Sequence, residues 1–289
     1  MSRIAFATSK ALKELTEDDR LAVAPLKGRG ITVVPAIWND PKVAWDSFDL
    51  VVVRSPWDYM HHGDAFRQWF TTLDRAGVPV QNPTSVLRWN LDKVYLKWIE
   101  ERGGSVVPTE WVEKGGSVDL TEVLKRRGWT RAVVKPTLSG GAVDTWIIDQ
   151  GSASASQPKI LPILARCGLM IQPFLAEIET EGELSMLFYN GKYSHAVRKR
   201  PKSGDFRVQT DHGGTVEPAT PSVETLREAQ RIVDLRGEDL LYARVDGVVV
   251  GDEFLLMEYE VLEPQIFLPY HPQAVPRFVD AVEECLRRD

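Results

Sequence analysis

The sequence predicts an α/β protein with lobes of mixed α+β type: a doubly wound N-terminal lobe, a small central lobe and a C-terminal lobe with an antiparallel sheet. Three features predict this class. Short apolar strands alternate with amphipathic helices over roughly the first 80 residues, which is typical of a parallel sheet covered by helices. A glycine-containing loop follows a short strand in the region 131–144. Long strands then follow one another over 183–200 and 240–261.

Composition restricts the class of protein. The chain has 289 residues, of which 43% are hydrophobic and 26% charged, as is ordinary for a globular protein. The net charge of −6 gives no electrostatic reason to expect a nucleic acid or a membrane surface as a partner. Cys167 and Cys285 are the two cysteines and show no metal-binding or disulfide spacing, which suits a reducing cytoplasm. The sequence therefore predicts a cytoplasmic globular protein.

The N-terminal lobe is expected to hold three strands and two helices. The segment LVVVRS is apolar enough to lie in the middle of a parallel sheet. In the second helix apolar residues recur at three- and four-residue spacing, so one face packs on the sheet. Pro25 predicts that the first helix is kinked or ends early. The expected strands are 3–8, 31–38 and 50–55, and the expected helices are 18–30 and 62–77.

Two further lobes are expected after a linker helix within 82–104. The serine- and alanine-rich segment 150–158 is expected to be an exposed loop of the central lobe. A polar loop is expected at 201–214 in the C-terminal lobe. The expected domains are 1–82, which binds the substrate, 83–182, which contains the linker helix and a lid, and 183–289, which carries the catalytic residues. Further strands are expected at 105–112, 131–136, 145–149, 183–191, 192–200, 240–250 and 253–261, and further helices at 119–128, 158–167 and 222–237.

A lysine at the end of an apolar strand is the first candidate for chemistry. Lys135 ends the strand RAVVKP, and such a lysine must extend to solvent, form an ion pair or bind an anion. The turn Ser139-Gly140-Gly141 follows, and its amides can approach phosphate oxygens because glycine has no Cβ. The spacing is not that of a P-loop. An ordinary strand-end lysine beside a tight turn is the alternative.

A second candidate lies where an apolar strand meets a proline. In the segment IQPF, Pro173 cannot donate a hydrogen bond, so a hinge at Gln172 and Phe174 would leave main-chain groups free to read an adenine edge. Glu183, a few residues later, could accept hydrogen bonds from ribose hydroxyls. The alternative is an ordinary strand exit followed by an acidic loop.

Two strands near the C-terminus carry charges at a spacing of two residues. Arg244 and Asp246 lie on one face of the first strand, and Glu258 and Glu260 lie on one face of the second. If the turn at 251–252 makes a hairpin, the three carboxylates converge, and a hard divalent cation with oxygen ligands would relieve their repulsion. The spacing therefore predicts a magnesium site, with a half-exposed strand face as the alternative.

Taken together in chain order, these segments resemble the ATP-grasp superfamily, and in particular its branch related to prokaryotic glutathione synthetase. The resemblance extends over nearly the whole chain and implies an ATP-grasp fold. It implies that Arg54 in VVVRSPWDY contacts a substrate carboxylate and that Lys93 in WNLDKVYL contacts the nucleotide phosphates. It also implies that Lys199 and Arg207, in the strand and mobile loop RKRPKSGDFRVQTDHGGT, act on the reacting phosphate. The roles that it implies for the other segments are phosphate binding for Lys135, Ser139, Gly140 and Gly141, adenine binding for Gln172 and Phe174, ribose binding for Glu183, catalysis for Arg244 and metal binding for Asp246, Glu258 and Glu260.

Within the superfamily, the segments RSPWDY, YSHAVRK, GDFRVQ and EYEVLEPQIFL look closest to the O-ureidoserine cyclo-ligases of D-cycloserine biosynthesis. This resemblance implies an ADP-forming ligase of antibiotic biosynthesis that activates a small amino-acid-like carboxylate as an acyl phosphate. A nitrogen of the same molecule would then attack to close a ring. It implies ATP and two Mg²⁺ ions as cofactors, Mn²⁺ as a substitute and a homo-oligomer as the assembly. An intermolecular ligase of the glutathione synthetase type and a non-catalytic nucleotide-binding relative remain as alternatives.

Overall fold

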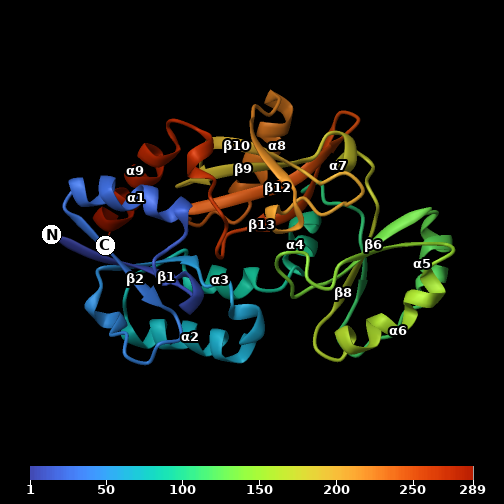
Figure 1. Cartoon of the computed structure of the whole chain (residues 1–289), viewed down its shortest axis with the longest axis horizontal. Helices are drawn as coiled ribbons and strands as arrows, with labels where there is room; N and C mark the ends of the chain where they lie inside the picture. Colours follow the sequence, from blue (N-terminus) through green and yellow to red (C-terminus); the bar gives the residue numbers. More distant parts are fainter. Residues whose placement is uncertain (289) are drawn as a thin grey trace.

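The computed structural model describes residues 1–288 and contains three separate sheets. The N-terminal sheet, the central sheet and the C-terminal sheet belong to three lobes, with the central lobe at one end of the long axis (Figure 1). The two chain ends lie near each other at the opposite end, beside helices α1 (Glu17–Gly28) and α9 (Ala274–Arg288). No helix within residues 1–288 combines the length and the apolar character that a membrane span requires.

The N-terminal sheet is parallel and has the order β2-β1-β3-β4. This confirms the doubly wound lobe that strand–helix alternation predicts. Helix α1 continues through Pro25 to Gly28, so the expectation of an early end was wrong. Pro25 lies on the exposed face, where water can bind the carbonyl that loses its donor. The elements of this lobe, besides α1, are β1 (Ser2–Thr8), β2 (Ile31–Ile37), β3 (Leu50–Ser55), α2 (Gly63–Ala76) and β4 (Val80–Gln81).

The linker forms two helices where one was expected. Helix α3 (Thr84–Asn90) and helix α4 (Tyr95–Glu101) are separated by a short turn that contains Lys93. The break allows the Lys93 main-chain N–H to donate to the Thr137 carbonyl at 2.9 Å. Apolar residues of both helices pack with the C-terminal lobe, so the linker belongs to that core.

The central sheet is antiparallel, with the order β5-β8-β6-β7. Residues 150–152 form a turn, but residues 153–158 of the segment 150–158, expected to be a loop, form the start of α6. Ala153 and Ser156 are buried, and the Gln157 side chain bonds to the main chain of 118 and 120, so tertiary contacts outweigh the polar composition. The elements of this lobe are β5 (Glu110–Val112), α5 (Leu120–Arg127), β6 (Arg131–Pro136), β7 (Trp146–Asp149), α6 (Ala153–Leu164) and β8 (Leu169–Pro173).

The C-terminal sheet is antiparallel, as expected, with the order β11-β10-β9-β12-β13. Its core is continuous with that of the N-terminal lobe. One apolar cluster contains residues of α1, β1 and β3 from the N-terminal lobe and residues of α9, β9, β10 and β12 from the C-terminal lobe. The elements of this lobe, besides α9, are α7 (Glu177–Thr180), β9 (Glu183–Tyr189), β10 (Lys192–Arg200), β11 (Thr215–Ala219), α8 (Val223–Asp234), β12 (Tyr242–Val250) and β13 (Glu253–Glu260).

One buried amide joins the N-terminal lobe to the C-terminal sheet. The Asn82 side chain is fully buried, and its Nδ2 donates to the Tyr242 carbonyl at 2.8 Å and to the Val261 carbonyl at 2.7 Å. Both acceptors belong to the β12–β13 region that carries the charged residues. Asn82 therefore fixes the position of these strands relative to the parallel sheet.

We expect Asn82→Ala to lower the free energy of unfolding by about 2–4 kcal/mol, because two buried carbonyls lose their donor. Urea unfolding of the full chain measures the loss. Asn39→Ala is the control, since Asn39 is exposed. Equal stability of the two variants would contradict the role of Asn82.

Candidate active site

The charged strands form the expected antiparallel hairpin. Arg244 lies opposite Glu260, and Asp246 lies opposite Glu258. Gly251 in the turn has a positive φ of 61°, a conformation that favours glycine. The hairpin prediction is thus confirmed, and the two-residue spacing brings all four charged side chains to neighbouring positions.

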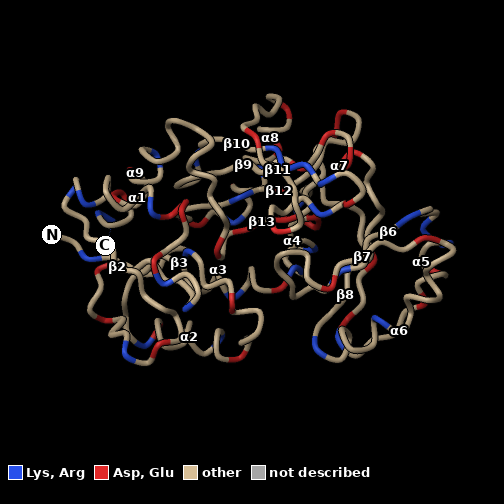
Figure 2. The backbone as a smooth tube through the Cα atoms, in the orientation of Figure 1, with Lys and Arg blue, Asp and Glu red and all other residues tan. Residues whose placement is uncertain are grey.

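Arg244 lies between two of the carboxylates. Its Nη2 is 2.8 Å from Asp246 Oδ2, its Nε is 2.9 Å from Asp246 Oδ1, and Nη2 also bonds to Glu260. Burial would raise the pKa of Asp246, but Arg244 and Lys199 outweigh it and hold that pKa below its usual value. Burial raises the pKa of Glu260 well above its usual value despite Arg244, and the other acids act in the same direction. Figure 2 shows basic and acidic segments interleaved around β12 and β13.

The third acid is paired with a linker residue. Glu258 Oε1 lies 3.0 Å from Lys93 Nζ, which also bonds to the Ser139 carbonyl. The buried Lys93 would have a lowered pKa from desolvation, but Glu258 raises it above its usual value. Lys93 therefore joins the acid-bearing hairpin directly to the glycine loop.

The expected convergence of three carboxylates on one point is absent. Among the described residues, no three Asp, Glu, His or Cys side chains are close enough to hold a metal ion together. The reason is electrostatic, because Arg244 and Lys93 occupy the space beside the acids and neutralise them. The donor chemistry of Asp246, Glu258 and Glu260 still fits a hard cation, since all donors are carboxylate oxygens. The metal assignment stays a prediction that requires these internal cations to move.

Glu183 lies in the same buried charge cluster. Its buried carboxylate bonds to Lys199 Nζ, which also lies 3.1 Å from Asp246 Oδ2. Burial and Asp246 raise the pKa of Glu183 above its usual value. The ribose contact of Glu183 stays a prediction, and it requires Lys199 to leave this carboxylate. Lys199 thus lies beside the acids, and its action on a reacting phosphate stays a prediction.

Lys135 is the cation near this cluster that lacks a partner. Its side chain is partly buried, and within residues 1–288 Nζ makes no ion pair or hydrogen bond. Burial lowers the pKa of Lys135 to about 8, and Lys93 acts in the same direction. An anion bound here would restore the charge of the ammonium. The site therefore fits a phosphate group on physical grounds.

The glycine loop lies where the three lobes meet. Gly141 has a positive φ of 58°, and Met60 of the N-terminal lobe lies beside Gly140. From the C-terminal lobe, His212 Nε2 lies 3.3 Å from the Gly141 carbonyl oxygen. Ser139 contributes its carbonyl to Lys93 and directs its hydroxyl to the Pro136 carbonyl. The loop is thus close to both Lys93 and the polar loop 201–214.

The expected hinge differs in its hydrogen bonds. The Gln172 side chain is buried and donates to Thr109 Oγ1 at 2.8 Å. The Phe174 N–H donates to the Arg131 carbonyl at 3.0 Å, so strand pairing continues past Pro173 and this N–H is not free. The Arg131 guanidinium lies 3.9 Å from the centre of the Phe174 ring. The adenine role of this segment stays a prediction, and the Phe174 ring is half-buried.

Arg207 does not reach the charge cluster. It forms a two-pronged ion pair with Asp205, with Nη2 to Oδ2 at 2.7 Å and Nε to Oδ1 at 3.1 Å. Both residues belong to the polar loop 201–214, which has no long regular element and ends in a short 3-10 turn, Thr210–His212. A contact of Arg207 with a reacting phosphate therefore requires the loop to rearrange.

Arg54 is in a different environment from the one expected. It ends β3 as predicted, but its side chain is 1% exposed, with Nε 2.8 Å from Asp19 Oδ1 and Nη2 3.0 Å from the Pro264 carbonyl. Tyr242 lies beneath the guanidinium, whose carbon is 5.0 Å from the ring centre. A buried arginine needs a carboxylate partner, and Asp19 supplies it. In this structure Asp19 and Pro264 bind the guanidinium, so a contact of Arg54 with a substrate carboxylate stays a prediction that requires this pairing to change.

The sequence reasoning missed an acid that lies close to the hairpin. Glu263 follows β13 and is half-buried, and the Tyr59 hydroxyl lies beside its carboxylate. Trp57 Nε1 donates to the Glu263 carbonyl at 3.1 Å. Tyr59 also stacks on Phe66, with ring centres 4.6 Å apart. The signal in the sequence was the third acid of EYEVLE, which lies outside the two-residue spacing.

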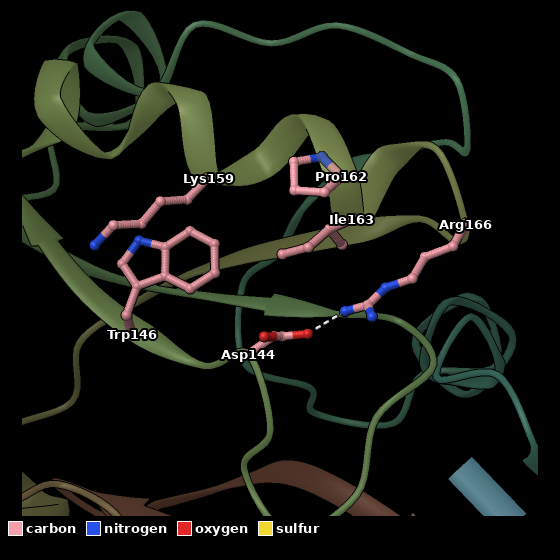
Figure 3. A pocket seen from close by; sticks show the side chains of 6 residues that line it. All are labelled: Asp144, Trp146, Lys159, Pro162, Ile163 and Arg166. Carbon is pink, nitrogen blue, oxygen red and sulfur yellow. Dashed lines mark hydrogen bonds and ion pairs between the residues drawn. The ribbon is translucent and has the colours of Figure 1, made fainter. Parts of the chain in front are cut away.

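A cavity of ≈390 Å³ lies elsewhere, within the central lobe (Figure 3). It is bordered by Trp146 of β7, and the Asp144–Arg166 ion pair lies at one side. None of the predicted site residues lines it. The cavity is therefore distinct from the candidate active site.

Comparison with known proteins shows which families and structures this chain resembles. The family described as D-cycloserine synthetase DcsG, N-terminal domain, matches residues 4–82. The cycloserine biosynthesis protein DcsG of Streptomyces lavendulae is 28% identical over 273 residues, which are 89% of this chain and 90% of that protein. The crystal structure of D-cycloserine synthetase DcsG has a TM-score of 0.87 at 26% identity and covers 98% of this chain and 99% of that chain. A structure of the ATP-grasp ligase PsnB has a TM-score of 0.68 at 18% identity, with 99% of each chain covered.

The chain has the ATP-grasp fold. The glutathione synthetase of Parasynechococcus marenigrum (strain WH8102) is 30% identical over 201 residues, which are 66% of this chain and 59% of that protein. The similarity to glutathione synthetase and the similarity to D-cycloserine synthetase were both expected from the sequence motifs. In the ATP-grasp fold of this protein, the glycine loop, the Lys93 turn and the β12–β13 hairpin come together at the candidate site.

We expect Arg54→Met to lower the free energy of unfolding by about 3–5 kcal/mol, because it leaves the Asp19 carboxylate buried without a cation. Urea unfolding measures the change. The double variant Arg54→Met/Asp19→Asn should recover part of the loss. A single variant of wild-type stability with a raised KM for a carboxylate substrate would instead support the substrate role.

We expect ATP affinity to fall above pH 8, by about tenfold per pH unit, because phosphate binds the protonated form of Lys135. Binding at pH 8 should take up about half a proton, which calorimetry in buffers of different ionisation enthalpy detects. Lys135→Arg should remove this pH dependence, since arginine stays charged. The same pH profile in wild type and variant would contradict the assignment.

Proposed function

We propose that the protein is an ADP-forming ligase that uses ATP to activate a carboxylate as an acyl phosphate and then closes a carbon–nitrogen bond. The observation that carries the proposal is the partly buried Lys135 ammonium beside the glycine loop, which has no ion pair or hydrogen bond with any residue of 1–288. It supports a nucleotide phosphate as the missing anion. The full-length similarity to D-cycloserine synthetase supports the ligase class.

The residues of the cluster have distinct proposed tasks. Lys135, Lys93 and the amides of the glycine loop bind the phosphates. Arg244 holds Asp246 and Glu260 at a fixed spacing and presents positive charge toward the transferred phosphoryl group. Asp246, Glu258 and Glu260 would hold Mg²⁺, as two ions that Mn²⁺ can replace, and the ions would neutralise phosphate charge.

Ligand binding must rearrange the internal ion pairs. Lys93 is bonded to Glu258, so its transfer to a phosphate leaves that carboxylate available for a cation. Lys199 is shared by Glu183 and Asp246, and Arg207 is held by Asp205 in the loop 201–214. Closing of this loop would bring Arg207 to the reacting phosphate and exclude water from the acyl phosphate.

The proposed substrate is a small amino acid of the O-ureidoserine type, and the proposed product is a cycloserine-type five-membered ring. The attacking nitrogen then belongs to the same molecule as the acyl phosphate. Such an attack has a high effective concentration, so the enzyme has only to fold the substrate correctly. The similarity to glutathione synthetase favours a second candidate, an intermolecular ligase that joins an amino acid to a separate amine.

We expect ATP-dependent phosphate release with O-ureidoserine in the absence of any added amine. Glu258→Gln should reduce this rate more than about 100-fold with unchanged secondary structure. The reason is that the Mg²⁺ proposed to neutralise the phosphate charge would lose a carboxylate ligand. Phosphate assays over a panel of amino acids, with and without hydroxylamine or glycine as amine, measure both effects. Strict dependence on a separate amine would reject cyclisation and favour the intermolecular ligase.

A further inference from the structure

The segment that follows β13 is fixed in place through its main chain. Residues 263–268 are held by side chains from the N-terminal lobe and from β12, and Phe267 has a positive φ of 51°. The segment thus has one defined position beside the charge cluster. The donors to its carbonyls are Trp57 (Glu263, 3.1 Å), Arg54 (Pro264, 3.0 Å) and Arg244 (Gln265, 3.0 Å), and the Asp18 carboxylate accepts from the N–H groups of Ile266, Phe267 and Leu268 at 3.0, 2.9 and 2.6 Å.

The Glu263 side chain is left with an unusual environment. It is half-buried, and within residues 1–288 its carboxylate has no ion-pair partner, only the Tyr59 hydroxyl beside it. Burial raises the pKa of Glu263, and Glu258 acts in the same direction, while Tyr59, Arg244 and Lys93 oppose them. The carboxylate is therefore close to the hairpin acids and the phosphate lysine, but no cation of the protein binds it.

The other acids near the site are already satisfied. Asp18 accepts three main-chain N–H groups, and Asp19 is paired with Arg54. Of the described acids around the cluster, Glu263 is thus the one without a cation or a set of amide donors. The remaining pairs are Glu258 with Lys93, Glu260 with Arg244, Asp246 with Arg244 and Lys199, and Glu183 with Lys199.

Two charged residues without an ion-pair partner among residues 1–288 therefore lie near the Lys93–Glu258 pair. Among the described residues, Lys135 forms no ion pair with a carboxylate and Glu263 forms none with a cation, although Glu258 and Lys93 lie near both. An α-amino acid whose carboxylate receives a phosphoryl group carries an ammonium only two bonds from the reacting carbon. When phosphates occupy the Lys135 side, this ammonium needs a carboxylate close by on the side of the N-terminal lobe.

We propose that Glu263, oriented by the Tyr59 hydroxyl, binds the α-ammonium group of the amino-acid substrate and so selects amino acids over simple carboxylic acids. This inference rests on the proposed function, because it assigns a specificity residue to the same site. Glu263 is a substrate-binding residue in this view. Tyr59 is a positioning residue that acts through it.

The test compares Glu263→Gln with wild type on O-ureidoserine and on its analogue without the α-amino group. The variant keeps the shape and removes the charge, so KM for O-ureidoserine should rise about 10- to 100-fold, as expected for a lost charge-assisted hydrogen bond. KM for the analogue and the Kd for ATP should be unchanged. Tyr59→Phe should raise KM for O-ureidoserine by a smaller factor, and Glu253→Gln, at the exposed end of β13, should have no effect.

Equal changes for O-ureidoserine and the analogue, or no change for either, would overturn the assignment of Glu263. If wild type releases no phosphate with any amino acid, the proposed function fails separately. Calorimetric binding of O-ureidoserine and D-serine in the presence of a non-hydrolysable ATP analogue then decides the inference. Binding that is weakened by Glu263→Gln alone supports it, whereas equal binding or no binding in both proteins rejects it.

Discussion

Charge neutralisation on one side of the C-terminal sheet is the constraint on which the site depends. The hairpin places Asp246, Glu258 and Glu260 on neighbouring positions, where like charges repel more strongly than in water. The protein meets this repulsion with its own cations, Arg244 from the same strand and Lys93 from the linker. Lys93 lies in the break between α3 and α4, and its side chain binds the Ser139 carbonyl of the glycine loop.

This internal neutralisation links stability to ligand binding. The cations that stabilise the ligand-free protein are the groups that phosphates would attract, so each ion pair is also a barrier to binding. Nucleotide and metal together can replace these pairs without leaving an uncompensated charge, whereas either one alone would leave one. Lys135 and Glu263 differ from the rest of the cluster because neither forms an ion pair with any residue of 1–288.

The N-terminal lobe fixes the position of β12 and of the segment that follows β13. Arg54 and Trp57 donate to main-chain carbonyls after β13, and Asn82 donates to carbonyls of β12 and of the residue that follows β13. Contacts to main-chain groups do not depend on the side chains of the segment that they hold. The segment 263–268 can therefore carry different side chains on a fixed backbone, which makes it a suitable place for substrate selection.

The sequence by itself determined the features that depend on local periodicity. Alternation of strands and helices gave the parallel lobe, and the two-residue spacing put Arg244 and Asp246 on one face of a strand. The pairing of charges that are distant in the sequence was decided only by the tertiary structure. Asp19 pairs with Arg54, Lys199 with Glu183 and Lys93 with Glu258. Burial likewise explains why residues 153–158 of the polar segment 150–158 form the start of a helix. Local sequence specifies which face a side chain occupies, but the partner of a buried charge depends on which other segments the fold brings to it.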